Sequence, residues 1–247
     1  MKSKKQLIKE EAHHQDSQIS QDPNNYTHNT FEQWIRSRAA HAYASVFTKH
    51  NKRQLKVLDI GTGTGGNAFR IAKEGHHVTT IDISPKSLEF TRNYFRAHGI
   101  ESLLQTELSD GYDFLCNAKQ GEFDIISGSN VLHHLPEVEL AIEQIANLNP
   151  KAVAFLEPIG TNPVYQIIRW YLARFASSHT IDEEPFKGKF LNKIRALFPG
   201  VKITFLGAAT PSNFLKNTPL KYIDDPISNS PLIWRLSKKC SICWEQS

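Results

Sequence analysis

Short apolar runs alternate with segments of helical character along the middle of the chain. The run at 55–60 ends in glycines, and the run at 78–82 is followed by Ser84 and Pro85, which suit the N-cap and first position of a helix. Short apolar runs bounded by such signals predict buried strands, and apolar residues at helical spacing predict helices. The expected strands are 55–60, 78–82, 103–108, 123–127, 151–157, 201–206 and 239–245, and the expected helices are 31–49, 65–73, 85–97, 136–147, 162–176 and 186–197.

This alternation predicts an α/β fold with a mostly parallel sheet. Strands that alternate with helices form βαβ units, and their right-handed crossovers place helices on both faces of the sheet. No repeat or linker divides the chain, so residues 1–247 are expected to form one domain. The first 30 residues are polar and are expected to form a mobile arm or lid outside the core.

Composition and charge narrow the functional classes. The 247 residues are 40% hydrophobic and 22% charged, which excludes a disordered or collagen-like chain. The 29 basic and 25 acidic residues are scattered and leave a net charge of +4. A nucleic-acid-binding protein usually shows a clustered basic face, so this balance permits nucleic-acid binding without favouring it.

Cysteine usage and hydropathy favour a cytoplasmic location. Only Cys116, Cys240 and Cys243 occur, too few for a disulfide framework. Cys240 and Cys243 form a C-x-x-C pair, but no second pair completes a zinc site, so we interpret both as ordinary strand residues. No apolar core of a signal peptide follows the N-terminal lysines, and no run approaches the roughly 18 apolar residues of a membrane span.

A glycine-rich turn follows the first expected strand. Glycines are needed where a strand turns sharply into a helix and a ligand approaches the backbone. Gly61, Gly63 and Gly66 satisfy the dinucleotide pattern G-x-G-x-x-G, whereas Gly61, Gly63 and Gly65 equally satisfy G-x-G-x-G. Asp82 ends the next strand, 21 residues after Gly61, where an acid can accept hydrogen bonds from ribose hydroxyls. Together these features predict an adenosine-containing ligand at the carboxyl ends of the strands.

Further residues distinguish between the two patterns. Asp59 precedes the first glycine by two positions, Ile83 follows Asp82, and Glu107 lies near the end of the third strand. The fourth strand begins Phe123-Asp124-Ile125-Ile126 and is followed by Val131-Leu132-His133-His134. From about Lys56 to Pro158 the chain thereby resembles the class I S-adenosylmethionine (SAM)-dependent methyltransferases, in particular their type 11/12 domains.

The resemblance implies a Rossmann-like seven-stranded sheet of order 3-2-1-4-5-7-6 with strand 7 antiparallel. It also implies SAM as cofactor and S-adenosylhomocysteine (SAH) as product. In this arrangement Cys240 and Cys243 point to opposite sides of the last strand. The cofactor-binding residues it implies are Asp59, Gly61, Thr62, Gly63, Gly65, Asp82, Ile83, Glu107, Leu108, Gly128 and Ser129.

The acceptor side follows strands four and five. His133 or His134 is a candidate base, and Glu157 could orient or deprotonate an acceptor. The alternatives are a structural turn for the histidines and a solvated or helix-capping role for Glu157. The resemblance implies that residues 1–50 form a lid and residues 158–198 a helical cap. His14, Tyr26, Tyr165 and Arg169 lie in these segments and are therefore candidate acceptor-binding residues. The alternative for His14 and Tyr26 is an unstructured tail, and the alternative for Arg169 is a solvated helix charge. No metal-binding constellation stands out.

The resulting hypothesis is a SAM-dependent methyltransferase that acts on an O or N atom of a small molecule by direct displacement, as a monomer or homodimer. One alternative keeps the cofactor but takes RNA or protein as substrate. The Ser129-Asn130-Val131-Leu132 stretch, in place of an Asn-Pro-Pro-Tyr-like motif, argues against it. Two others are a nucleotide-dependent oxidoreductase and a SAM-binding scaffold without turnover.

Overall fold

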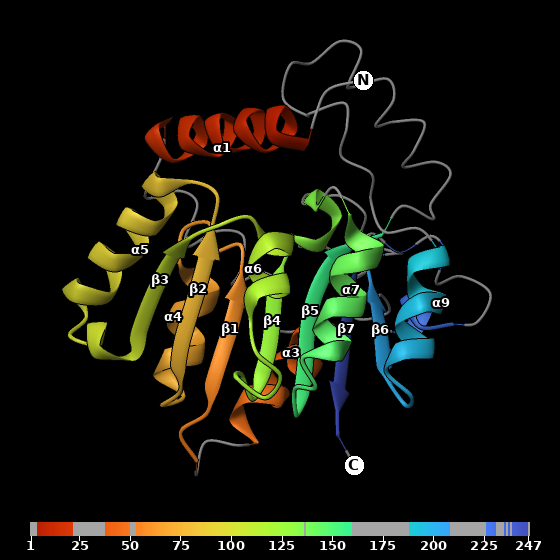
Figure 1. Ribbon diagram of the computed structural model, residues 1–247. Helices are drawn as coiled ribbons and strands as arrows, with labels where there is room; N and C mark the ends of the chain where they lie inside the picture. The colour runs from red at the N-terminus through yellow and green to blue at the C-terminus, as the bar shows by residue number, and fades with distance from the viewer. Residues whose placement is uncertain are drawn as a thin grey trace.

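A seven-stranded sheet forms the centre of the protein, in the order β3-β2-β1-β4-β5-β7-β6 (Figure 1). The computed structural model describes residues 4–21, 38–49, 53–135, 137–159, 188–207, 226–230, 235, 237 and 239–246. β7 pairs antiparallel with both β5 and β6, and the other pairs are parallel. The strands are β1 Lys56–Ile60, β2 His77–Asp82, β3 Leu104–Leu108, β4 Ile125–Ser129, β5 Ala152–Pro158, β6 Lys202–Leu206 and β7 Lys239–Glu245.

The expected fold, strand order and antiparallel last strand are confirmed. Most expected strands lie within one residue of their predicted bounds, whereas β4 begins and ends two residues later than predicted. The reason for this difference is local: Phe123 precedes the strand, and the amide of Asp124 donates to the carbonyl of Lys56 at 2.8 Å just before regular pairing begins. The N-cap prediction also holds, because Ser84 Oγ accepts from the amide of Ser87 at 3.0 Å.

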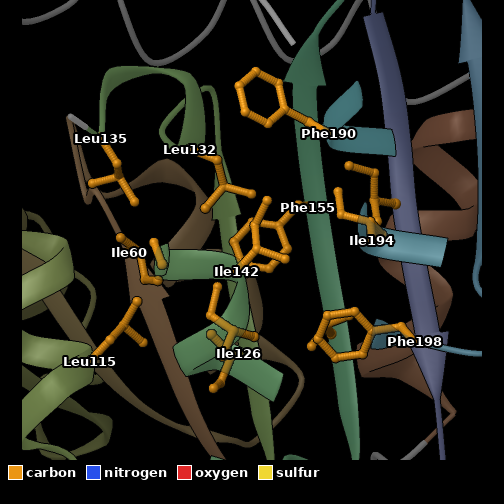
Figure 2. Close-up of a cluster of buried hydrophobic side chains, with 14 of the residues drawn as sticks. Ile60, Leu115, Ile126, Leu132, Leu135, Ile142, Phe155, Phe190, Ile194 and Phe198 are labelled. Atoms are coloured by element: carbon orange, nitrogen blue, oxygen red, sulfur yellow. The ribbon is translucent and has the colours of Figure 1, made fainter. Parts of the chain in front are cut away.

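Helices cover both faces of the sheet, and successive strand residues enter two different cores. On one face α3, α4 and α5 pack with Val57, Ile125 and Ala154. On the other face α6, α7 and α9 pack with Leu58, Ile126 and the residues drawn in Figure 2. The bounds of these helices are α3 Arg38–Thr48, α4 Gly66–Lys73, α5 Pro85–Ala97, α6 Gly111–Asn117, α7 Val138–Asn147 and α9 Gly188–Leu197.

The two-core arrangement places the last two cysteines apart. Cys240 lies in the core that contains Leu58, and Cys243 lies in the core that contains Val57. Side chains an odd number of residues apart in a strand point to opposite faces. The prediction that these two side chains point to opposite sides of the strand is therefore confirmed.

Two helices differ from the expectations. In the polar segment that was expected to be a mobile arm or lid, residues Lys4–Gln21 form the helix α1, which Figure 1 shows across the carboxyl ends of the strands. Its sequence is polar on all sides, so it carries no apolar stripe from which a helix could be predicted. The short helix α6 was not expected either, although Asp110 caps it by accepting from the amides of Tyr112 and Asp113, each at 3.1 Å.

Some expected segments lie outside the described residues. The helix expected at 162–176 is one, and only the edges of the expected cap at 158–198 are described, including α9. Among the residues that are described, no helix combines the length and apolarity required to cross a bilayer.

Candidate functional site

The loop between β1 and α4 holds three glycines in left-handed backbone conformations. Their φ angles are +73° at Gly61, +52° at Gly63 and +75° at Gly65. A Cβ atom added at Gly61 would lie 2.6 Å from Val131, and one at Gly65 would lie 2.8 Å from Thr91. A Cβ atom at Gly63 would meet nothing within 4 Å. The outer glycines are therefore required by packing, while the middle one leaves open space in which a ligand can approach the backbone.

Asp82 joins this loop to the turn after β2. Its Oδ2 accepts from the amide of Gly63 at 3.0 Å, and its Oδ1 accepts from the amide of Ser84 at 2.8 Å. Burial raises the pKa of this carboxyl group, the backbone hydrogen bonds partly offset that rise, and the charge of Asp16 adds to it. Asp82 thus orders the open part of the loop. The second lone pair of each carboxylate oxygen can accept a further donor.

Asp59 lies beneath the loop and is fully buried. Asn67 Nδ2 donates to its Oδ1 at 2.5 Å, and Thr80 Oγ1 donates to its Oδ2 at 3.2 Å. Ser127 Oγ is a further donor, at 3.4 Å, and the phenol of Tyr43 donates to Asn67 Oδ1 at 2.8 Å. The carboxylate of Asp59 therefore faces other side chains of the protein and not the open surface of the loop.

A third buried carboxylate, that of Glu157, lies at the end of β5. Glu157 Oε1 accepts from the amides of Val131 and Leu132 at 3.0 and 3.1 Å. Its Oε2 lies 2.8 Å from Nδ1 of His133. Since a carboxylate accepts, the imidazole donates from Nδ1, which leaves Nε2 as the acceptor nitrogen of the neutral ring. Glu157 thus caps the 3₁₀ turn at Leu132–His134 and orients the first of the two histidines.

Helix α1 contacts the carboxyl edge of the sheet at two places, the turn after β4 and the turn after β2. Nδ1 of His134 lies 3.5 Å from Oε1 of Glu11, and the ring of His134 lies 4.1 Å from that of His133 between centroids. Further along α1, Asp16 Oδ1 accepts from the hydroxyl of Ser84 at 2.5 Å. One helix therefore spans from the turn after β2 to the turn after β4.

The structure brings most of the predicted cofactor residues to the carboxyl edge. Thr62 is buried with its hydroxyl 3.2 Å from that of Thr91, and Ile83 is half-buried beside Asp82. Gly128 is buried, Ser129 is half-buried, and Glu107 and Leu108 are exposed at the end of β3. His14 belongs to α1, but its side chain lies outside the described residues, as do Tyr26, Tyr165 and Arg169 entirely.

Several residues at this edge were not expected from the sequence. Asn67 follows the glycine turn directly, and this position was the one available signal. Tyr43, Thr80 and Ser127 are distant from the turn in sequence and depend on the sheet register for their place. The acidic residues of α1 that reach the edge, Glu11 and Asp16, carried no distinguishing pattern.

A separate groove of about 610 Å³ runs beside the edge of the sheet. Its lining includes Thr79, Gln105, Phe114 and Phe123. It reaches the carboxyl edge at Glu107, but none of its lining residues belongs to the glycine loop. The groove is therefore distinct from the space in front of Gly63.

The segment that contains the glycine loop, Asp82 and the turn after β4 matches a known protein family. Residues 58–150 match a family described as "Methyltransferase domain". The chain is 31% identical over 110 residues to a ubiquinone biosynthesis O-methyltransferase of Bordetella avium (strain 197N), covering 44% of each chain. It is 26% identical over 136 residues to the protein of the same name from Aeromonas salmonicida (strain A449), covering 53% of this chain and 56% of that one. The chain thus spans 44% and 56% of the lengths of these two curated relatives.

Comparison of folds extends the similarity beyond these segments. A SAM-dependent methyltransferase from Archaeoglobus fulgidus superposes with a TM-score of 0.57 at 20% identity, covering 87% of this chain and 98% of that one. Geranyl diphosphate C-methyltransferase from Streptomyces coelicolor A3(2), solved with SAH, superposes with a TM-score of 0.58 at 13% identity, covering 84% and 79%. At these identities the similarity establishes the fold.

Proposed function

We propose that this chain, whose residues 58–150 match a methyltransferase domain, is a class I SAM-dependent methyltransferase that transfers a methyl group from SAM to an oxygen or nitrogen atom of a small molecule. The observation that carries the proposal is the open left-handed position at Gly63, held by a buried acid at the end of the next strand. Bound SAM would supply an electrophilic methyl group on a positively charged sulfonium.

The residues present fit such a cofactor. The backbone of Gly61, Thr62, Gly63 and Gly65 would lie against it at the start of α4, where the amino end of the helix offers donors. Asp82 would accept from the ribose hydroxyls, as acids at this place in related folds do. Ile83, Glu107 and Leu108 would surround the base, and Gly128 and Ser129 would border the reacting end. We place Asp59 behind the loop, as a residue that supports it.

The turn after β4 provides the candidate base. The fixed orientation of His133 by Glu157 is the arrangement in which a carboxylate holds an imidazole for proton transfer. Nε2 of His133 would accept the proton of a hydroxyl acceptor, and His134 would border the same space. An acceptor held in line with the methyl group would gain several kcal/mol of barrier lowering from proximity and orientation alone.

The names of the relatives support a small-molecule acceptor. Two are ubiquinone biosynthesis O-methyltransferases, and a further solved structure with this fold is a phosphoethanolamine N-methyltransferase from Haemonchus contortus, with a TM-score of 0.59 at 13% identity over 94% of this chain and 59% of that one. The buried histidine–glutamate pair favours a hydroxyl acceptor, because a hydroxyl must lose its proton during methylation. His14, Tyr26, Tyr165 and Arg169 stay proposals as acceptor-binding residues.

The proposal is tested by incubating the protein with SAM and a panel of phenols, catechols and primary amines. SAH formation and a product heavier by one methylene group are then measured by mass spectrometry. We expect acceptor-dependent SAH formation with at least one hydroxyl acceptor. SAH formation with nucleic acid or protein alone, or no SAH formation with any acceptor, would contradict the small-molecule assignment.

A further inference from the structure

We infer that Tyr43 is a positioning residue for the glycine loop, acting through the side-chain amide of Asn67 on the buried carboxylate of Asp59. The inference deepens the proposed function, since the loop is the proposed cofactor site. We call the three residues the relay. Tyr43 comes from α3, Asn67 from α4 and Asp59 from β1, so the relay connects three elements around the loop.

The hydrogen bonds of the relay have a defined direction. The phenol of Tyr43 donates to Oδ1 of Asn67 at 2.8 Å, and Nδ2 of Asn67 donates to Oδ1 of Asp59 at 2.5 Å. If the amide were flipped, its NH₂ group would face the phenol and its oxygen would face a carboxylate oxygen. The ionised carboxylate of Asp59, which can only accept, therefore fixes the amide orientation, and the hydroxyl of Tyr43 donates to the amide oxygen that is left facing it.

The relay connects both ends of the glycine loop. Asp59 lies two residues before Gly61, and Asn67 is the second residue of α4, which begins directly after Gly65. Thr80 and Ser127 are the register partners of Asp59 on the neighbouring strands. The hydroxyl of each is shared between the carboxylate of Asp59 and a backbone carbonyl of β1. A carboxylate held by β2 and β4 thus sets the position of the first turn of α4, and with it the loop.

The relay does not itself reach the open space before Gly63. Asp59 is fully buried and Tyr43 is 4% exposed. Tyr43 also packs edge-on against Phe47, with ring centroids 5.3 Å apart. Any effect of the phenol hydroxyl on a ligand of the loop must therefore pass through its hydrogen-bonding neighbours Asn67 and Ser127 to Asp59, whereas the ring contributes to packing.

The charge of Asp59 provides a readout of the relay. Burial raises the pKa of its carboxyl group to about 7, with Asp82 adding to the rise, while the hydrogen bonds from Asn67, Thr80 and Ser127 lower it. Burial and the charge of Asp59 raise the pKa of Tyr43 well above its ordinary value, so the phenol stays a donor near neutral pH. Arg70 and Cys243 are the other ionisable groups that face Tyr43.

The hydroxyl of Tyr43 should strengthen the hydrogen bond at Asp59. Donation to the amide oxygen polarises the amide, and linked hydrogen bonds reinforce one another. Removing the hydroxyl should therefore weaken donation from Asn67 to the ionised carboxylate. The pKa of Asp59 should then rise further, whereas loss of ring packing alone would not move it in this way.

The test compares Tyr43→Phe with the control Tyr94→Phe, which removes a phenol hydroxyl from α5 outside the relay. The carboxyl carbon of Asp59 is titrated by ¹³C NMR in the protein without ligand, and SAH affinity is measured by calorimetry at pH 7. In Tyr43→Phe we expect the Asp59 midpoint to rise by about half a pH unit or more and the Kd for SAH to rise about 3- to 10-fold. Tyr94→Phe should match the wild type in both.

The outcomes separate the parts of the inference. An unchanged Asp59 midpoint in Tyr43→Phe would overturn the relay. A raised midpoint with unchanged SAH affinity would overturn its positioning role. If the wild type showed the Asp59 midpoint but bound no SAH at millimolar ligand, the proposed function would fail, and the positioning role with it, while the relay would stand.

Discussion

Gly63 and Gly65 share a left-handed backbone but differ in what surrounds them. Alanine in this conformation costs about 1–2 kcal/mol at either position. At Gly65 the added Cβ would also lie 2.8 Å from the buried Thr91, and such overpacking costs about 1–3 kcal/mol more. We predict by urea unfolding that Gly65→Ala loses more stability than Gly63→Ala. For SAH affinity, measured by calorimetry, we predict the opposite ranking: Gly63→Ala should lose more affinity than Gly65→Ala. Equal stability losses would contradict the packing difference.

Glu157 is the residue on which the turn after β4 depends. Glu157→Gln places an NH₂ group against either two backbone amides or the Nδ1–H of His133. A buried donor left facing a donor costs about 1–3 kcal/mol of stability. The rate of methyl transfer to a hydroxyl acceptor should fall about 10²- to 10⁴-fold, with little change in SAH affinity. The exposed Glu245→Gln, which loses only a surface ion pair with Lys49, is the control. Full activity in Glu157→Gln would exclude the proposed base.

A hydrogen bond between Asp16 and Ser84 connects helix α1 to the turn after β2. Asp16→Ala removes the acceptor of the Ser84 hydroxyl and a charge that raises the pKa of Asp82. We therefore predict faster amide hydrogen exchange in α1 and a lower pKa of Asp82, with little change in global unfolding. Exchange is measured by mass spectrometry, and Asp113→Ala on α6 is the reference variant. Unchanged exchange in α1 would show that this contact does not hold the helix.

The elements differ in how far the sequence could predict them. The strands and α5 were predictable because buried strands read as short apolar runs and because Ser84 and Pro85 mark a helix start. Helix α1 was not, because its sequence has no apolar stripe, and α6 was too short to show a period. At the site, the glycines and Asp82 followed from spacing. The relay did not, because the contact between Tyr43 and Asn67 joins residues 24 apart through tertiary packing.

At the scale of the whole molecule, the buried Asp59 makes stability depend on pH. Its folded pKa of about 7 lies above the ordinary 3.8, so the folded protein holds a proton that the unfolded chain has released between these values. Stability contributed by this group is therefore lost as pH rises from about 4 to about 7, by about 4 kcal/mol.

Asp59→Asn tests this linkage because it cannot ionise. The free energy of unfolding of the wild type minus that of Asp59→Asn should decrease between pH 4 and pH 7, as measured by urea denaturation at each pH. Asp124→Asn is the contrasting variant: burial raises the pKa of Asp124, but Lys151 and the amide of Lys56 together outweigh this rise and hold the pKa below its ordinary value. A difference between wild type and Asp59→Asn that stays constant over this range would contradict the linkage.

The central claim is that the open glycine loop and Asp82 bind SAM, and a single calorimetric titration of SAH into the full chain tests it most directly. The account predicts saturable binding at one site per chain, weakened at least about tenfold in Asp82→Ala, which removes the acceptors of the Gly63 and Ser84 amides. Absence of binding at millimolar SAH, or equal binding by Asp82→Ala, would contradict it.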